Sequence, residues 1–188
     1  MPLALSAELE FSASPSKYMP APVVVTSALI IRPATVEDRD QIWAVLKPVF
    51  RAGDTYATDP AISRRAALEY WCSASRSVWV AIKDAQVVGS YYLCANQSGG
   101  GKHVCNCGFV TSPKAQGQGV ARGMLDHALE AARQTDYRAM QFNFVVATNH
   151  RALALWQRAG FDVVGRLPGA FQHPTQGYVD ALILYQTL

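Results

Sequence analysis

The sequence predicts an α/β (α+β) fold in which about seven strands form one sheet with helices packed against it. Apolar runs of strand length alternate with segments whose apolar residues recur every three or four positions. Their order along the chain is strand, two helices, three strands, helix, strand, helix and two strands. Near the middle, residues 103–134 form the pattern of a buried strand, a short glycine-containing loop and a helix in direct succession. Such an alternation is typical of a sheet that is covered by helices.

The composition fits one globular domain. The chain has 188 residues, half of them apolar, and a formal net charge of +3. Residues 1–27 are rich in alanine, serine and proline, so we expect a poorly ordered extension there and a single domain over residues 28–188. The small, scattered charge does not favour nucleic acid as a partner. No apolar run reaches the roughly 20 residues of a membrane span, so no membrane contact is expected either.

The N-terminus and the cysteines indicate a cytoplasmic protein. The chain does not open on a basic segment followed by a long apolar run, so a signal peptide is not expected. Cys105 and Cys107 lie two positions apart in a strand and have the character of small core residues. Neither they nor Cys72 and Cys94 belong to a pattern of metal ligands, so we expect reduced thiols and no metal.

The first half of the domain is predicted to hold one strand and two helices. The strand covers residues 28–32, and the helical pattern that follows runs to about Arg51. Asp59 and Pro60 are the residue types of an N-cap and a first helical position, so a second helix is expected to begin there. The loop between these helices carries Tyr56, which we expect to line a substrate pocket.

The second half is predicted to hold six strands and two helices. The expected elements are a hairpin of residues 77–82 and 86–93, a strand over 103–110, a helix to about 134, a strand over 140–146, a helix over 149–159, and strands over 161–165 and 178–185. Residues 167–177 form a predicted loop that is long enough to cover a site. Open strand edges make a homodimer a reasonable expectation.

The loop between the central strand and its helix has the features of an anion site. The first turn of a helix leaves backbone N–H groups without partners at the positive end of the helix dipole. Gly117 and Gly119 place no Cβ in the way of an anion there. The spacing is not the Gly-x-Gly-x-x-Gly of dinucleotide sites, and no Gly-Lys-Ser/Thr is present. The sequence therefore predicts a site for a phosphate or pyrophosphate of another class of ligand.

Two motifs resemble those of the GCN5-related N-acetyltransferases (GNAT). The segment Gln116-x-x-Gly119-x-Ala121 matches the family's Gln/Arg-x-x-Gly-x-Gly/Ala. The segment Asn149-x-x-Ala152-x-x-x-Trp156-x-x-x-Gly160-Phe161 is similar to its Asn-x-x-Ala-x-x-x-Tyr-x-x-x-Gly-Phe. The resemblance implies the GNAT fold, a mixed twisted sheet with helices on both faces and strands splayed at the cofactor site. It also implies acetyl-coenzyme A as cosubstrate and a small-molecule amine as acceptor.

The resemblance also implies which residues hold the cosubstrate. Backbone groups of Phe109 and Val110 would pair with the pantetheine arm, as a strand does. Asn149 would lie close to the cofactor. The pyrophosphate would be held by the N–H groups of six consecutive residues, namely Gln116, Gly117, Gln118, Gly119, Val120 and Ala121.

One departure from the family pattern changes the expected chemistry. The family's tyrosine, which often protonates the departing thiolate, is replaced by Trp156, whose indole does not titrate. The remaining task is to stabilise the oxyanion, which amide donors can do. Asn106 and Asn143 lie in predicted strands, where asparagine is depleted, and are therefore our candidate catalytic residues.

A narrower resemblance concerns the acceptor. Residues 105–109, 142–149 and 177–181, with Gly53-x-Thr55-Tyr56, are similar to fungal N-acetyltransferases that detoxify proline analogues such as azetidine-2-carboxylate. This resemblance implies that Tyr56, Asn106 and Asn143 contact a small amino acid or cyclic imino acid. Two alternatives stay open. The acceptor could be a polyamine, an antibiotic or a protein N-terminus, or the chain could bind acetyl-coenzyme A as a sensor without transferring the acetyl group.

Overall fold

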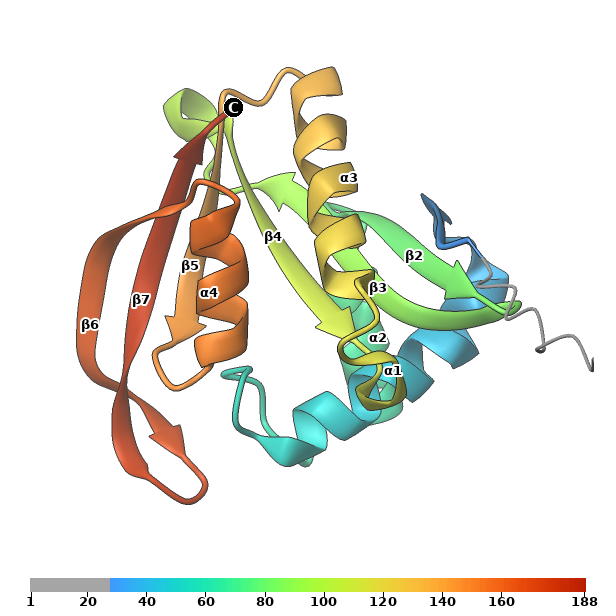
Figure 1. Ribbon diagram of the computed structural model, residues 1–188, viewed down its shortest axis with the longest axis horizontal. Coiled ribbons are helices and arrows are strands. Elements are labelled where there is room, and N and C mark those ends of the chain that lie inside the picture. Colours follow the sequence, from blue (N-terminus) through green and yellow to red (C-terminus); the bar gives the residue numbers. More distant parts are fainter. Residues whose placement is uncertain (1–27) are drawn as a thin grey trace, which may run out of the picture.

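The computed structural model describes residues 28–188, so the predicted N-terminal extension lies outside the described residues (Figure 1). The strands are β1 (Ile30–Pro33), β2 (Ser77–Lys83), β3 (Gln86–Ala95), β4 (Val104–Thr111), β5 (Ala139–Val146), β6 (Asp162–His173) and β7 (Gly177–Thr187). The α-helices are α1 (Arg39–Ala52), α2 (Arg64–Trp71), α3 (Val120–Gln134) and α4 (His150–Arg158). The predicted order of strands and helices is confirmed.

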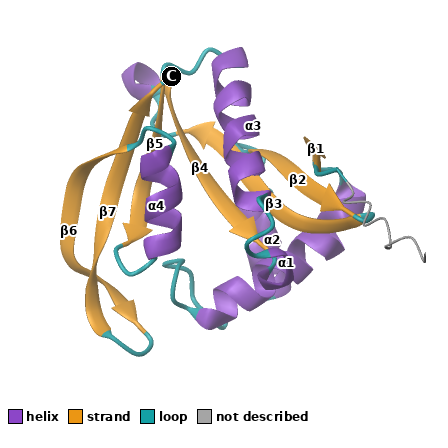
Figure 2. Cartoon of the chain, in the orientation of Figure 1, coloured by secondary structure: helices purple, strands orange, loops and turns teal. Residues whose placement is uncertain are grey.

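The seven strands form one mixed sheet in the order β1-β2-β3-β4-β5-β7-β6. Only β4 and β5 are parallel, and every other neighbouring pair is antiparallel. Helices α3 and α4 cover one face and α1 and α2 the other (Figure 2). The predicted fold class is therefore confirmed. The edge strands are β1 and β6, which would be the edges available to the predicted homodimer.

Each face of the sheet has its own apolar core. Successive residues of a strand point to opposite faces, so Tyr91 packs with α3 and α4 whereas Tyr92 packs with α1 and α2. Both tyrosines are buried. Among residues 28–188, the largest fully buried side chain is Trp71 of α2, whose indole Nε1 donates to the Ser90 hydroxyl at 2.9 Å. This bond satisfies a polar group that would otherwise be costly to bury.

The parallel pair β4 and β5 separates along its length. The two strands pair only from Val104–Ala139 to Asn106–Gln141, although β4 continues to Thr111 and β5 to Val146. Figure 1 shows the two strands meeting at their N-terminal ends and diverging toward their C-terminal ends. This divergence creates the space in which the candidate site lies.

Two predicted boundaries are wrong. The second helix begins at Arg64, not at Asp59, because the Ser63 hydroxyl caps it by accepting the Ala66 N–H, while the Asp59 carboxylate accepts the Ala61 N–H in a turn. Residues 167–177 are mostly not a loop, because β6 continues to His173 and pairs with β7 up to Gly177. The last two strands therefore form a long hairpin.

An ion pair connects β1 to the first helical segment, a short 3-10 helix at Val36–Asp38. Arg32 donates to both carboxylate oxygens of Asp38, at 2.7 and 2.9 Å, and the Thr35 N–H donates to the same carboxylate at 2.8 Å. The Arg32 hydrogen bonds lower the pKa of Asp38 from 3.8 to about 2, even though the carboxylate is buried. The ionised form is therefore the one that stabilises the fold.

We expect Asp38→Asn to lower the free energy of unfolding by about 1–2 kcal/mol at pH 7. Because the folded pKa lies below the unfolded value, the stabilisation is nearly complete above about pH 5 and is lost as the pH falls toward 2. Urea unfolding at pH 7 and at lower pH values measures this difference. Asp162→Asn, which changes an exposed carboxylate, is the control. An equal loss for Asp38→Asn at every pH would contradict the electrostatic account.

Candidate functional site

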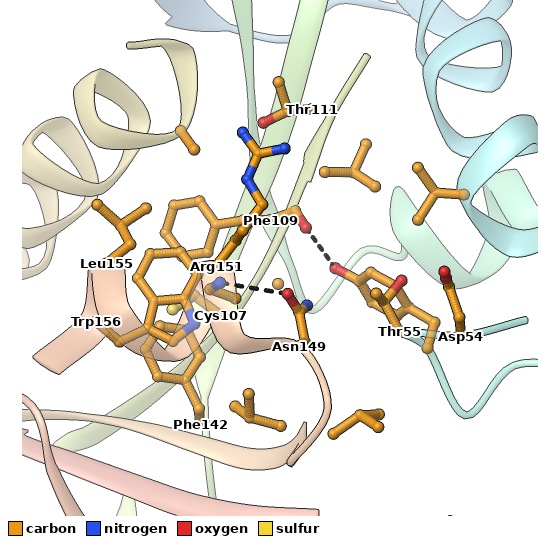
Figure 3. A pocket seen from close by; sticks show the side chains of 18 of the residues that line it. Asp54, Thr55, Cys107, Phe109, Thr111, Phe142, Asn149, Arg151, Leu155 and Trp156 are labelled. Carbon is orange, nitrogen blue, oxygen red and sulfur yellow. Dashed lines mark hydrogen bonds between the residues drawn. The ribbon is translucent and has the colours of Figure 1, made fainter. Parts of the chain in front are cut away.

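A cavity of about 1050 Å³ opens where β4 and β5 separate. Its walls come from the loop after α1, from β4 and β5, from the glycine loop before α3, and from α4. Figure 3 shows Trp156, Phe109 and Phe142 at one side, with Asp54 and Thr55 at the opposite side. The cavity therefore joins the loop predicted to bind an anion with the strands that carry the candidate asparagines.

Three aromatic side chains fill the base of the opening between the two strands. The rings of Phe142 and Trp156 stack with their centroids 4.9 Å apart, and Phe109 lies 5.2 Å from Trp156. Trp156 is buried, with 6% of its surface exposed. Each such aromatic contact contributes about 0.5–1.5 kcal/mol beyond burial. The departure from the family's tyrosine thus has a packing role, because the indole fills the gap between the strands.

The glycine loop at the start of α3 has the geometry of an anion site. Gly117 and Gly119 have φ angles of +76° and +78°, which favour glycine, and a Cβ on either would meet nothing within 4 Å. The N–H groups of Gly117, Gly119, Val120 and Ala121 donate to no other residue among those described. All four residues line the cavity. Free donors at a helix N-terminus fit a pyrophosphate.

The two glutamines of this loop behave differently from each other. Gln116 lines the cavity, and its side-chain oxygen accepts from Arg151 of α4 at 2.9 Å. Gln118 does not line the cavity. Its side chain bonds Lys83 and the Lys114 carbonyl on the outer side of the loop. Its N–H donates to the Ala115 carbonyl at 3.4 Å, so Gln118 shapes the loop from outside.

Arg151 is a cavity residue that sequence reasoning missed. It lies at the second position of α4, and like Thr111 at the end of β4 it lines the cavity (Figure 3). Its bond to Gln116 links α4 to the glycine loop across the opening. Arg122 also lines the cavity but pairs with Asp126 at 2.9 Å. The signal for Arg151 was its place within the second motif, two positions after the cap residue Asn149.

Tyr56 connects the loop after α1 to β4. Its hydroxyl donates to the Phe109 carbonyl at 2.8 Å, and burial raises the pKa of this phenol well above its usual value. The phenol therefore remains a hydrogen-bond donor at neutral pH. Beside it, the hydroxyl of Thr55 is buried and has no partner among the described residues. Tyr56 and Thr55 both line the cavity, together with Phe109 and Val110 of β4.

The structure brings the two candidate catalytic asparagines together. Asn106 of β4 and Asn143 of β5 both line the cavity, and both donate to the side-chain oxygen of Asn96, which follows β3. Asn149 lines the cavity as well, and its side chain caps α4 by accepting the Ala152 N–H at 3.2 Å (Figure 3). Asn96 carried no signal in the sequence, because its contacts depend on strands that are distant along the chain.

The thiols near the cavity are neutral. Cys107 lines it, and burial raises the pKa of its thiol well above the usual value. Burial also raises the pKa of Cys105 to about 12. A thiol nucleophile must ionise, so neither cysteine fits an acetyl-cysteine intermediate. Within residues 28–188, no group of three or more His, Cys, Asp or Glu side chains could hold a metal ion. No helix in the same range could cross a membrane.

Comparison with known families agrees with this geometry. The profile of the Acetyltransferase (GNAT) family matches residues 40–161, which include the glycine loop, both asparagines and all of α4. The chain belongs to the GNAT acetyltransferase family. Membership implies acetyl-coenzyme A as the acetyl donor. The loop residues fit that donor, because free N–H groups face a cavity with no Cβ in the way.

Relatives of this GNAT chain include a curated yeast protein and solved structures. N-acetyltransferase aca1 of Schizosaccharomyces pombe is 34% identical over 98 residues, which cover 52% of this chain and 47% of aca1. The match thus spans about half of the curated relative. A GCN5-related N-acetyltransferase from Kribbella flavida has a TM-score of 0.82 and 37% identity, over 86% of this chain and 98% of its own.

A more distant neighbour shows the fold alone. The yncA protein of Salmonella typhimurium, a putative acetyltransferase solved with its cofactor acetyl-CoA, has a TM-score of 0.75 at 19% identity. The alignment covers 86% of this chain and 95% of yncA.

We expect Gly117→Val and Gly119→Val to weaken coenzyme A binding at least tenfold. A branched side chain is strained at these φ angles and projects toward the space where an anion would meet the N–H groups. Isothermal titration with coenzyme A measures the Kd. Gly99→Val is the control, because Gly99 also has a positive φ of +62° and open surroundings but lies in the turn before β4. Wild-type affinity in both loop variants would refute the anion site.

Proposed function

We propose that the chain is an acetyl-coenzyme A-dependent N-acetyltransferase that transfers the acetyl group to the amine of a small molecule by direct attack in a ternary complex. One observation carries the proposal. A single cavity exposes unpaired helix N–H groups at one wall and a pair of asparagine amides at another. The first is suited to a pyrophosphate and the second to a carbonyl and an amine.

The chain offers defined groups to the donor. The N–H groups of Gly117, Gly119, Val120 and Ala121 would bind the pyrophosphate, and Arg151 adds positive charge. The part of β4 beyond Asn106 no longer pairs with β5, so its free backbone edge would pair with the pantetheine arm. The bond from Tyr56 to the Phe109 carbonyl holds this part of β4 in place.

The reaction needs no titrating acid from the protein. A neutral amine attacks the acetyl carbonyl, a C–N bond forms, the C–S bond breaks, and the amine loses one proton to water. The leaving thiol has a pKa of about 8.5, so it departs acceptably as a thiolate. Asn106 and Asn143 would orient the amine and stabilise the oxyanion. Because Trp156 replaces the usual tyrosine, the chain lacks a titrating acid at this position. The leaving group does not require that acid.

We propose an amino acid or cyclic imino acid as the acceptor. Support comes from the narrower motif resemblance and from the asparagine pair that it includes. The cavity that the asparagines line is also lined by Tyr56, Tyr70 and Tyr92, with Asp54 as a charged residue.

A panel of amines tests the proposal and its rivals. We expect thiol release from acetyl-coenzyme A to be fastest with a small amino or imino acid. A preference for a polyamine, an antibiotic or an N-terminal peptide would support transfer to another acceptor and contradict the proposed substrate class. Binding of acetyl-coenzyme A without thiol release from any amine would favour the sensor and contradict the enzyme.

We expect Asn143→Ala to lower kcat for the preferred amine by about 100-fold, because a positioned amide donor contributes on the order of two to three powers of ten. The Kd for coenzyme A should stay unchanged, since the anion loop is untouched. Gln141→Ala, which removes the neighbouring amide that donates to Asn143 at 2.8 Å, should have a smaller effect. Wild-type turnover by Asn143→Ala would exclude the amide mechanism.

A further inference from the structure

Asn96 occupies a fixed place next to the paired part of the sheet. It follows the last residue of β3, and its backbone N–H donates to the Val104 carbonyl of β4 at 2.8 Å. Its side chain is half-buried and does not line the cavity. A residue in this position can act on the site only through the side chains that it contacts.

Its side-chain oxygen receives both candidate catalytic amides. The Asn143 amide donates to Asn96 Oδ1 at 2.6 Å, and the Asn106 amide donates to the same oxygen at 3.4 Å. These two bonds connect β4 to β5 at the level where their backbone pairing ends. Asn96 therefore links the two strands through side chains at the point where their backbone pairing ends.

The network couples the orientations of the four amides, because each bond takes a donor from one amide and an acceptor from the next. Gln141 donates to Asn143 Oδ1 at 2.8 Å, and the Asn143 amide offers its NH₂ group to Asn96. Asn96 presents its oxygen to this group and also to the NH₂ group of Asn106. The amide groups of Asn106 and Asn143 each keep one further N–H. Asn106 Oδ1 accepts no hydrogen bond from the described residues.

We propose that Asn96 is a positioning residue that holds the amides of Asn106 and Asn143 in one orientation for acetyl transfer. In this orientation the free oxygen of Asn106 accepts an N–H of the incoming amine, which aims the nitrogen lone pair at the acetyl carbon. The second N–H of Asn143 donates to the acetyl oxygen. The inference rests on the proposed acetyltransferase function and specifies an acceptor that carries at least one N–H.

The test compares three variants in steady-state turnover of the preferred amine. Asn96→Ala removes the shared acceptor, and we expect kcat/KM to fall about 10- to 100-fold. Asn96→Asp keeps an oxygen acceptor for both N–H groups, so it should recover to within about fivefold of the wild type. Gln97→Ala, which removes the exposed amide of the next residue, is the matched control and should keep wild-type turnover.

Two further measurements separate positioning from general damage. The Tm and the Kd for coenzyme A should be the same in all three variants and the wild type. In an Asn143→Ala background, Asn96→Ala should cost much less than it does alone, because one of its two partners is already absent. Full additivity of the two substitutions would contradict the shared network.

The outcomes distinguish the two proposals. Wild-type kcat/KM in Asn96→Ala, or equal losses in Asn96→Ala and Asn96→Asp, would overturn the positioning role and leave the acetyltransferase intact. A fall in Tm or in coenzyme A affinity that accounts for the loss of turnover would likewise overturn it. A wild-type chain that acetylates no amine would overturn both.

Discussion

The loss of backbone pairing between β4 and β5 is the constraint on which the site depends. Two parallel strands that separate leave N–H and C=O groups without partners, and these are costly to bury. Aromatic packing compensates part of the cost, because Trp156 stacks on Phe142 and also contacts Phe109 at the base of the opening. The Tyr56 hydroxyl satisfies one β4 carbonyl. The remaining edge of β4 is left for a ligand that can pair with an extended strand.

Two kinds of binding group lie along β4 in this opening. The C-terminal end of β4 leads into the loop with free helix N–H groups, while Asn106 lies near its start. The step from Asn106 to Val110 spans about 13 Å of extended chain. A donor with phosphates at one end and a reactive acyl group at the other can satisfy both ends at once. Binding energy from the phosphates can then position a reacting group that they do not touch.

The order of elements and the glycine loop between β4 and α3 could be predicted from the sequence, since both follow from local patterns. Gly117 and Gly119 mark this loop in the sequence, and in the structure both have a positive φ angle. The helix expected at Asp59 begins at Arg64 instead. Both Asp59 and Ser63 are N-cap residue types, and it is Ser63 that caps the helix. The extension of β6 came from pairing with β7, and the contacts of Asn96 came from three strands. Such long-range pairing leaves no local pattern to read.

The replacement of tyrosine by Trp156 links packing to mechanism. A phenol at this position could donate a proton, whereas an indole cannot, but the larger ring fills the gap between the separated strands. Burial holds the nearby Tyr56 phenol and Cys107 thiol neutral, so neither supplies a base near pH 7, and the Tyr56 hydroxyl already donates to the Phe109 carbonyl. Neutral amides, which do not titrate, are then left to orient the amine and to stabilise the oxyanion. An amide can help the reaction only if its N–H and C=O groups point at the reacting atoms. Holding the amides in that orientation requires a hydrogen-bond network such as the one that Asn96 completes.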